Sequence, residues 1–406
     1  VGPSRDELEV LIDKADVVVD AIFGTGFHGN LRAPFSIWIP TVNECADCVV
    51  SIDVPSGLNA ETGVVDDDCI RAEHTVTMIA PKIGLYSADG PEYAGDLICG
   101  NLYDRLDEVI DDVDHAAEIV EPGDLVDFFA PLPTNIDKYS RGSVLIVAGS
   151  AQYPGAAIMA AKSAARAGAG YVAVAAPDAG ANLIRMALPS IPVFAIPSDS
   201  RGSFGAAARM TVCEIAKKYS CVLCGPGMTT SAGAMQVVSG LLELEVPLIL
   251  DADALNLLAG HTELIENLPK NTILTPHHLE FDRLFGKNDT SYERLNKARE
   301  MAIRYHIIIV LKGANTAIIT PKGDVLFNSS GNAGMATAGS GDTLTGMITG
   351  LLAQGYHPIP AAILGVFLHG MAGDLAAEKD SQEYITARDI ISQIGQAYKK
   401  LHNYRV

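Results

Sequence analysis

Residues 332–346 read Asn-Ala-Gly-Met-Ala-Thr-Ala-Gly-Ser-Gly-Asp-Thr-Leu-Thr-Gly, a glycine-rich loop that runs into a predicted helix at 343–354. Glycines allow a backbone to turn sharply and to approach a ligand closely. A helix start offers unpaired N–H groups and the positive end of the helix dipole, which together bind phosphate. One carboxylate, Asp342, lies at the junction, where it is unfavourable beside phosphate unless it takes a proton from an attacking hydroxyl. The stretch therefore predicts a phosphate site with a base next to it.

Apolar runs of strand length alternate with helical patterns along the chain, which is typical of parallel α/β sheets. In the first part we expect strands at residues 16–23, 48–54 and 73–85 and a weak helix at 34–46. In the second part we expect strands at residues 143–149, 171–176, 221–224, 247–250, 272–275 and 307–311, and a hairpin at a sheet edge at 318–328. The helices expected there are 156–167, 343–354, 359–378 and 386–400.

The length of 406 residues exceeds what one hydrophobic core usually serves, so two domains are expected. Residues 1–115 would form an incomplete Rossmann-like three-layer domain. Residues 116–139, acidic and then punctuated by prolines, would be a linker and the entry to the second domain. Residues 140–406 would form a larger three-layer α/β/α domain.

Composition and charge limit the function. From the sequence we expect no apolar run long enough to span a bilayer, and no signal peptide is visible, so we expect a cytoplasmic protein without a membrane partner. The formal charge of -20 argues against nucleic acid as a partner, because duplex binding needs a basic face. A phosphate ligand would approach against this field, so local N–H groups, a lysine or a metal must reverse it at the site.

Seven cysteines form an odd set that suits no disulfide framework. Two C-x-x-C pairs, Cys45/Cys48 and Cys221/Cys224, are the spacing of zinc ligands. The second pair lies in a predicted strand, where positions three apart face opposite sides, and the two pairs fall in different domains. We therefore expect buried, reduced cysteines.

Polar groups follow four predicted strands of the second part: 225–227, 251–253, 276–280 and 312–316. Ligands of open parallel sheets bind beyond the carboxyl ends of the strands, so one shared cleft is expected. Lys312 would meet phosphate as a point charge. Asp251 and Asp253 are open to two interpretations: they hold Mg²⁺, or Asp253 caps a helix at 254–258. His277 and His278 would orient a substrate, and no G-x-x-x-x-G-K-[ST] sequence is present.

The first part has its own polar strand ends. Gly24-Thr-Gly-Phe-His-Gly29 is formally the dinucleotide fingerprint, but residues 30–34 delay the helix that should start within it. Asp20 precedes this turn, and Asp53 and Ser56 follow the next predicted strand. Together these residues predict a second cleft with two carboxylates.

These stretches carry a family resemblance. VDAIFGTG (19–26) and SIDVPSGLNAETG (51–63) resemble NAD(P)H-hydrate epimerase domains. From about residue 140 onward the chain resembles ADP-dependent NAD(P)H-hydrate dehydratases of the ribokinase-like superfamily. The residues that carry it are RGSVLIVAGS (141–150), GAAIMAAKSAARAGAGYV (155–172), GPGM (225–228), LDADALN (250–256), LTPHHLEF (274–281), KGANT (312–316) and the opening loop. The fused pair resembles the bifunctional NAD(P)H-hydrate repair family.

The resemblance implies repair of NADH and NADPH whose nicotinamide ring has added water, giving R and S hydrates. The epimerase interconverts the two forms, and the dehydratase restores the S form with ADP and Mg²⁺. Phosphorylation of the ring hydroxyl, with Asp342 as the base, turns a poor leaving group into a good one. The residues implied to bind ADP are Lys312, Gly313, Ala314, Asn315, Thr316, Asn332, Ala333, Gly334, Ala338, Gly339, Ser340 and Gly341. Those implied to bind the hydrate are Ala156, Gly227, His277 and Asp342.

For the epimerase half, the resemblance implies a potassium ion at Asp20 and Ser56, and Asp53 as the residue that moves the proton. The residues implied to bind the hydrate there are Gly24, Thr25, Gly26, Phe27, His28, Gly29, Asn30 and Asp53. The family's upstream Asn/Gly-rich loop has no counterpart in this sequence, so we expect no interconversion of the hydrates by this chain. In the dehydratase half, His278 and Leu279 depart from the bacterial H-P-G-E pattern and resemble the eukaryotic form, which leaves ATP open beside ADP.

Three other functions share parts of this pattern. A ribokinase-like kinase of a vitamin precursor or sugar would use the same loop and the same base. A regulatory protein could bind the nucleotide without turnover, and a NAD-dependent dehydrogenase could use the turn at 24–29. The fused epimerase-like half argues against an ordinary kinase, whereas a decayed epimerase half would be compatible with the regulatory function. Small-residue helices favour a homo-oligomer.

Overall fold

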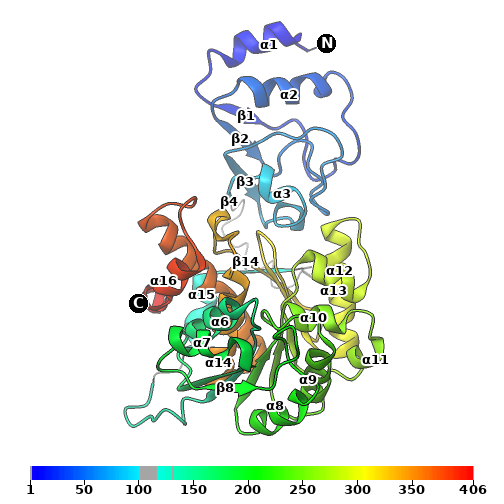
Figure 1. Cartoon of the computed structure of the whole chain (residues 1–406). Coiled ribbons are helices and arrows are strands. Elements are labelled where there is room, and N and C mark those ends of the chain that lie inside the picture. Colours follow the sequence, from blue (N-terminus) through cyan, green and yellow to red (C-terminus); the bar gives the residue numbers. More distant parts are fainter. Residues whose placement is uncertain (1, 101–116, 130–131, 406) are drawn as a thin grey trace. The chain divides into compact units, whose positions relative to one another are not determined.

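The computed structural model describes residues 2–100, 117–129 and 132–405 (Figure 1). It divides into two compact units. Unit 1 comprises Val1–Ala117 together with Asn288–Leu295, and unit 2 comprises Glu118–Lys287 together with Asn296–Val406. The mixed α/β class expected from the sequence is confirmed in both units.

Unit 1 is built on a four-stranded parallel sheet with the order β1-β2-β3-β4. Its strands are β1 (Val18–Asp20), β2 (Val49–Ile52), β3 (His74–Met78) and β4 (Asp96–Gly100). Its helices are α1 (Arg5–Ile12), α2 (Phe35–Cys45), the 3-10 turn η1 (Ile83–Leu85) and α3 (Gly90–Tyr93). The strand expected at 73–85 is too long, because the chain leaves the sheet after Met78 and turns at η1.

Unit 2 is built on a ten-stranded sheet with the order β5-β14-β13-β12-β11-β10-β9-β6-β7-β8. Its strands are β5 (Glu118–Val120), β6 (Ser143–Val147), β7 (Tyr171–Pro177), β8 (Val193–Ile196), β9 (Cys221–Cys224), β10 (Leu248–Leu250), β11 (Ile273–Leu274), β12 (Ile308–Leu311), β13 (Ala317–Ile319) and β14 (Val325–Asn328). Neighbouring strands from β8 to β12 run parallel, and β13 is antiparallel to both its neighbours. Their carboxyl ends therefore meet at one edge, which is where the sequence predicts a cleft.

Helices cover both faces of this sheet (Figure 1). On one side lie α6 (Pro154–Arg166), α7 (Asp178–Ala187), α14 (Ser340–Ala353), α15 (Pro358–Lys379) and α16 (Ala387–His402). On the other lie α8 (Ala208–Ala216), α9 (Ala232–Leu242), α10 (Asp253–Leu258), α11 (Thr262–Ile265), α12 (His278–Phe285) and α13 (Ser291–Tyr305). Short helical segments complete the chain at α5 (Pro122–Leu125), η2 (Val126–Phe128), η3 (Ala333–Met335) and η4 (Asn403–Arg405).

Three expectations about unit 2 need correction. The segment 116–139 is not only a linker, because β5 pairs in parallel with β14 and forms the outermost strand. The hairpin of β13 and β14 is therefore one strand away from the edge. The helix after the opening loop begins at Ser340 and not at Thr343, so Asp342 lies within its first turn.

Two compositional expectations also change. By length and composition α15 is apolar enough to cross a membrane, contrary to the expectation from the sequence, but most of it is buried as a core helix of unit 2. The cysteines are all free, and Cys221 and Cys224 are buried as expected, whereas Cys45 is exposed. Among the described residues, no group of three His, Cys, Asp or Glu side chains could hold a metal ion, so neither C-x-x-C pair forms a zinc site there.

Close packing of α14 on α6 holds the helix that follows the opening loop. A β-carbon at Gly346 would lie 2.1 Å from Ser163 Oγ and 2.3 Å from the carbonyl oxygen of Ala160. Such distances leave no space for a methyl group, so glycine permits the two helices to touch. Helix α14 is buried along almost its whole length, and its N-terminus is therefore rigidly placed.

We expect Gly346→Ala to destabilise unit 2 by about 1–3 kcal/mol, because the overpacked methyl outweighs the roughly 1 kcal/mol gain in helix propensity. Gly395 in α16 is the control, since a β-carbon there has nothing within 4 Å. Gly395→Ala should stabilise by about 0.5–1 kcal/mol. Urea unfolding followed by circular dichroism measures both, because the single tryptophan, Trp38, lies in unit 1. Equal effects of the two substitutions would contradict the close contact.

Candidate functional site

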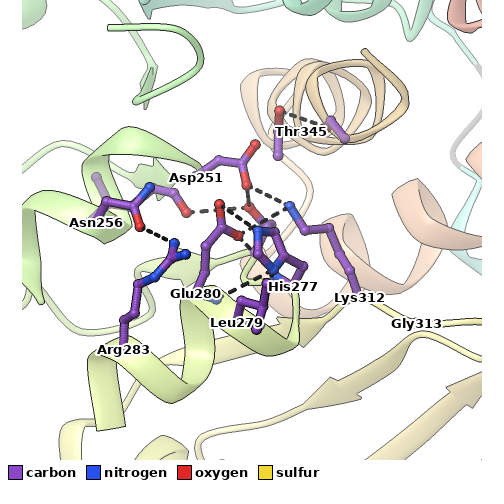
Figure 2. Close-up of polar contacts among 12 residues, drawn as sticks. Asp251, Asn256, His277, Leu279, Glu280, Arg283, Lys312, Gly313 and Thr345 are labelled. Carbon is purple, nitrogen blue, oxygen red and sulfur yellow. Dashed lines mark hydrogen bonds and ion pairs between the residues drawn. The ribbon is translucent and has the colours of Figure 1, made fainter. Parts of the chain in front are cut away.

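A lysine surrounded by carboxylates lies at the carboxyl edge of the unit 2 sheet (Figure 2). Lys312 follows β12, and its Nζ lies 2.9 Å from Asp251 Oδ1 and 3.8 Å from Glu280 Oε2. Burial disfavours the charged form of Lys312, but Asp251, Glu280 and Asp342 outweigh it and raise the pKa of the ammonium. Lys312 is therefore a fixed positive charge in a largely buried position.

The strand ends of β10 and β11 hold Asp251. Its Oδ1 also accepts a hydrogen bond of 2.8 Å from the Thr275 hydroxyl, and the side chain is buried. The next residue, Ala252, has a φ of 49°, which is unusual for a residue with a β-carbon and marks a sharp turn into α10. This turn leaves Asp253 as the first residue of α10 and not as its cap. Asp253 Oδ2 instead accepts a hydrogen bond of 2.9 Å from the backbone N–H of Thr229, so the capping interpretation is wrong.

His277 caps the helix that carries Glu280. Its Nδ1 accepts hydrogen bonds from the backbone N–H groups of Leu279 (3.1 Å) and Glu280 (3.4 Å), and Glu280 accepts one from the N–H of His277 (2.9 Å). Burial, then Lys312 and His278, lower the pKa of His277, which keeps Nδ1 free to accept. Only Nε2, 3.4 Å from Glu280 Oε1, remains for a substrate. His277-x-x-Glu280 has the spacing of the capping box S/T-x-x-E, so the sequence could have indicated that His277 caps this helix.

The pKa of the Asp342 carboxyl group is raised to near neutral pH. Burial raises its pKa to about 7, assisted by the nearby Asp251 and Asp253 charges and opposed by Lys312. A β-carbon at Gly341 would lie 3.6 Å from Lys312 Nζ, which places the ammonium beside the first turn of α14. The structure thus brings together the base, the lysine and the helix N-terminus that the sequence predicted separately. A pKa near the working pH suits a general base.

The opening loop is held from α15, which the sequence did not indicate. Asp374 accepts hydrogen bonds from the N–H of Gly331 (2.9 Å) and from Asn332 Nδ2 (2.8 Å). Asn332 in turn caps η3 by accepting from the N–H of Gly334. Nε2 of the buried His369 lies 3.4 Å from the Ser340 hydroxyl. Asp374 and His369 both lie within the apolar helix α15, where their spacing matches no recognisable motif.

Other predicted residues come together around the same loop. Gly227 has a φ of 63°, and a β-carbon there would lie 3.0 Å from that of Ala156. Gly339, the left-handed N-cap of α14, packs against Met159, one turn along α6 from Ala156. Helix α6 therefore carries one residue predicted to bind the hydrate, Ala156, and contacts both another such residue, Gly227, and the loop predicted to bind ADP.

The segment 312–316 is open on the side of its glycine. A β-carbon at Gly313 would meet nothing within 4 Å. The Thr316 hydroxyl donates 3.3 Å to the carbonyl of Gly313 and closes a short turn. Packing within the protein therefore gives no reason for the glycine, and close approach of a ligand is the remaining one.

In unit 1 the predicted potassium ligands bind each other. The Asp20 carboxylate is buried and accepts from the hydroxyls of Ser51 (2.8 Å) and Ser56 (2.6 Å) and from the N–H groups of Ser56 (2.8 Å) and Ile22 (3.2 Å). The Ser56 hydroxyl also accepts from the N–H of Phe23. These bonds occupy most of the lone pairs that an ion would need, and the potassium site stays a prediction.

Asp53 is held in a strained backbone position by a partner that the sequence analysis missed. It has a φ of 71° at the end of β2, and its carboxylate pairs with Lys82 and accepts from the N–H of Met78. Lys82 Nζ also donates to the Thr77 hydroxyl (3.1 Å) and the Met78 carbonyl (2.9 Å). Strain at a carboxylate in a loop is typical of functional positions.

The predicted dinucleotide turn follows β1 as an open loop. Gly24, Thr25, Gly26, His28 and Asn30 are exposed, and a β-carbon at Gly24 or Gly26 would meet nothing within 4 Å. No helix begins in this turn, since α2 starts only at Phe35. The geometry of a Rossmann fingerprint is therefore absent from these described residues.

The fold and the site define an α/β protein in which a lysine, several carboxyl groups and a helix N-terminus meet at the carboxyl edge of a mainly parallel sheet. The NAD(P)H-hydrate dehydratase family matches residues 144–396, and the YjeF-related protein N-terminus family matches residues 2–84. The bifunctional NAD(P)H-hydrate repair enzyme of Thermofilum pendens is 35% identical over 95% of this chain and 73% of its own length. The chain belongs to the family of bifunctional NAD(P)H-hydrate repair enzymes.

Solved structures support the same assignment for unit 2. The ADP/ATP-dependent NAD(P)H-hydrate dehydratase of Bacillus subtilis, crystallised with ATP and Mg²⁺, has a TM-score of 0.61 and 29% identity and covers 71% of this chain and 100% of its own. A ribokinase-like superfamily protein of Enterococcus faecalis has a TM-score of 0.62 and 27% identity, covering 71% of this chain and 98% of its own. The ribokinase-like fold predicted from residue 140 onward is confirmed.

The raised pKa of Asp342 has a consequence for stability. A carboxyl whose folded pKa is raised contributes stability below its ordinary pKa of 3.8, and this is lost as the pH rises through about 7. At pH 8 we therefore expect Asp342→Asn to increase the free energy of unfolding of unit 2 by roughly 2–4 kcal/mol, since each pKa unit corresponds to about 1.4 kcal/mol. At pH 4 the two proteins should be alike. Asp67→Asn, an exposed change in unit 1, is the control, and an equal difference at both pH values would contradict a raised pKa.

Proposed function

We propose that unit 2 dehydrates the S hydrate of NADH and NADPH with ADP as the phosphate donor. The observation that carries this proposal is Asp342, with its pKa of about 7, in the first turn of α14 beside the Lys312 ammonium. The N–H groups of this turn and Lys312 would stabilise the transferring phosphoryl group. The names of the relatives favour dehydration over an ordinary ribokinase-like kinase.

The proposed reaction has two stages. Asp342 takes the proton of the ring hydroxyl, whose oxygen then attacks the terminal phosphorus of ADP, and the bond to AMP breaks. The carbon–oxygen bond of the phosphorylated hydrate then breaks, and phosphate leaves with the electron pair as the ring nitrogen donates its own. Loss of a proton from the adjacent ring carbon restores the double bond. Unaided, the ring would have to release hydroxide, which is a poor leaving group.

Mg²⁺ would enter with the nucleotide. It prefers carboxylate oxygens, keeps several waters and takes few protein ligands. Asp253 fits this need, because its Oδ2 accepts from Thr229 N–H while its other oxygen has no hydrogen bond among the described residues. Asp251 fits less well, since its Oδ1 already serves Thr275 and Lys312. When bound, the ion supplies charge neutralisation for the phosphates.

An absorbance assay tests the proposal. The S hydrate of NADPH, mixed with ADP and Mg²⁺, should regain the near-ultraviolet absorbance of NADPH, and AMP should appear in equal amount. Asp342→Asn should lower kcat by roughly 10²–10⁴, because the general base is lost, while Asp67→Asn should leave it unchanged. No recovery with either ADP or ATP, or full activity of Asp342→Asn, would overturn the proposal. Replacement of ADP by ATP in the same cuvette determines the nucleotide.

For unit 1 we propose that Asp53, held by Lys82, is the proton-transfer group of an epimerase-type hydrate pocket on the loop 24–30. The strained φ of Asp53 and the open glycines of the loop support this assignment. Potassium at Asp20 and Ser56 would belong to the same pocket.

A pure R hydrate distinguishes a pocket from an active epimerase. Because hydrogen bonds within the protein already occupy most lone pairs of Asp20, we expect no NADPH from the R hydrate, ADP and this chain beyond its slow spontaneous conversion. The S hydrate in a parallel cuvette is the control for unit 2. Rapid recovery from the R form that is lost in Asp53→Asn would show instead that unit 1 is active and that Asp53 moves the proton.

A further inference from the structure

A cavity of about 450 Å³ lies among α6, α7 and α16 of unit 2. These helices gather on one side of the unit 2 sheet (Figure 1). Its lining residues come from the end of α6, the end of α7 with the loop after it, and the first turns of α16. None of them belongs to the residues predicted for ADP or for the hydrate. The cavity is therefore separate from the site described above.

The cavity is strongly cationic in a chain of net charge -20. Lys162, Arg166 and Arg388 line it, and no Asp or Glu side chain does. None of the three side chains makes a hydrogen bond or a close ion pair with another residue that the structure describes. Three unpaired cations in one concave surface repel one another, and an anion between them would relieve this repulsion.

Helix stability accounts for only one of these charges. Arg166 lies in the last turn of α6, where a cation complements the negative end of the helix dipole. Lys162 lies a full turn earlier. Arg388 lies in the first turn of α16, where a cation opposes the positive end of the dipole. The neighbouring Asp389 accepts at Oδ2 from the N–H and the hydroxyl of Thr386 at 2.9 and 2.6 Å, and it interacts with Arg388 through charge alone, without the close contact of an ion pair.

The rest of the lining combines apolar side chains with two serines, Ser190 and Ser392. Leu188, Ile191 and Ile391 form part of the wall, and Leu188 and Ile391 are buried. We propose that the cavity binds a small phosphate-bearing anion, with the phosphate groups on Lys162, Arg166 and Arg388.

The cavity lies next to the predicted nucleotide loop. A β-carbon at Gly339 would lie 3.4 Å from Met159 on α6 and 3.3 Å from Ala387 on α16. Lys162 follows Met159 by one helical turn, and Arg388 follows Ala387 directly. Helices α6 and α16 thus both contact the predicted nucleotide loop, and neighbouring residues of the same two helices line the cationic cavity.

Calorimetry with inorganic pyrophosphate as the probe tests this site. The protein is first titrated with ADP, which measures the nucleotide site, and pyrophosphate is then added to the ADP-saturated protein. We expect one pyrophosphate per chain, with an affinity that falls at higher salt because the contacts are ionic. In the double variant Lys162→Gln/Arg388→Gln the affinity should fall at least tenfold, while ADP binding persists.

The matched control is Lys399→Gln/Lys400→Gln, which removes the same charge from exposed positions of α16 outside the cavity. It should leave pyrophosphate binding unchanged apart from a small effect of net charge. Equal thermal midpoints of the two double variants exclude misfolding as the cause of any loss. No binding of pyrophosphate to the ADP-saturated wild type, or equal losses in both double variants, would overturn the proposal. Failure of the proposed dehydratase activity would appear separately, in the absorbance assay.

Discussion

The ammonium of Lys312 among the carboxylates of Asp251, Glu280 and Asp342 is the interaction on which the candidate site depends. Burying one of these charges alone would be prohibitive, so the lysine and its partners must be placed together. The ends of β10, the start of α12 and the end of β12 bring them to one edge of the sheet. The close packing of α14 on α6 then brings Asp342 to the same point. The order of the strands therefore determines where these charged groups meet, and the stability of the buried charges depends on that order.

Excess negative charge determines how the carboxylates differ. One lysine cannot neutralise three acids this close together, two of which are buried, so the charged forms of some of these carboxyl groups are disfavoured. The pKa of Glu280 is raised, by burial first, and that of Asp342 reaches about 7. Oδ1 of Asp251 accepts hydrogen bonds from the Thr275 hydroxyl and from the Lys312 ammonium, so Asp251 is the acid that pairs directly with Lys312. The environment thus separates a carboxylate that fixes the lysine from a carboxyl poised to exchange a proton.

Much of this arrangement could be predicted from the sequence, because it depends on local patterns. Apolar runs with polar residues at their ends located β9, β10, β11 and β12, and the glycine-rich loop located the start of α14 to within three residues. Interactions between distant segments could not be predicted. Asp374 and His369 act from an apolar helix, and Lys82 reaches Asp53 across β3 and the turn after it. The short β5 was missed because three residues of an acidic, proline-containing segment give no periodic signal. The homo-oligomer and the cytoplasmic location stay predictions.

Binding of a nucleotide, as proposed, would change the charge balance of the site. Its phosphates would add negative charge next to Asp342, which alone would raise the pKa of this carboxyl group further and oppose its proposed role as a base. Lys312 cannot compensate fully, because Asp251 already holds it. A divalent cation bound with the phosphates would supply the missing positive charge, and the N–H groups of α14 would supply more without any carboxylate partner. Asp342 would then lose its proton nearer to neutral pH. The number of acids around Lys312 is therefore a reason, beside the chemistry of phosphate, to expect a metal together with the nucleotide.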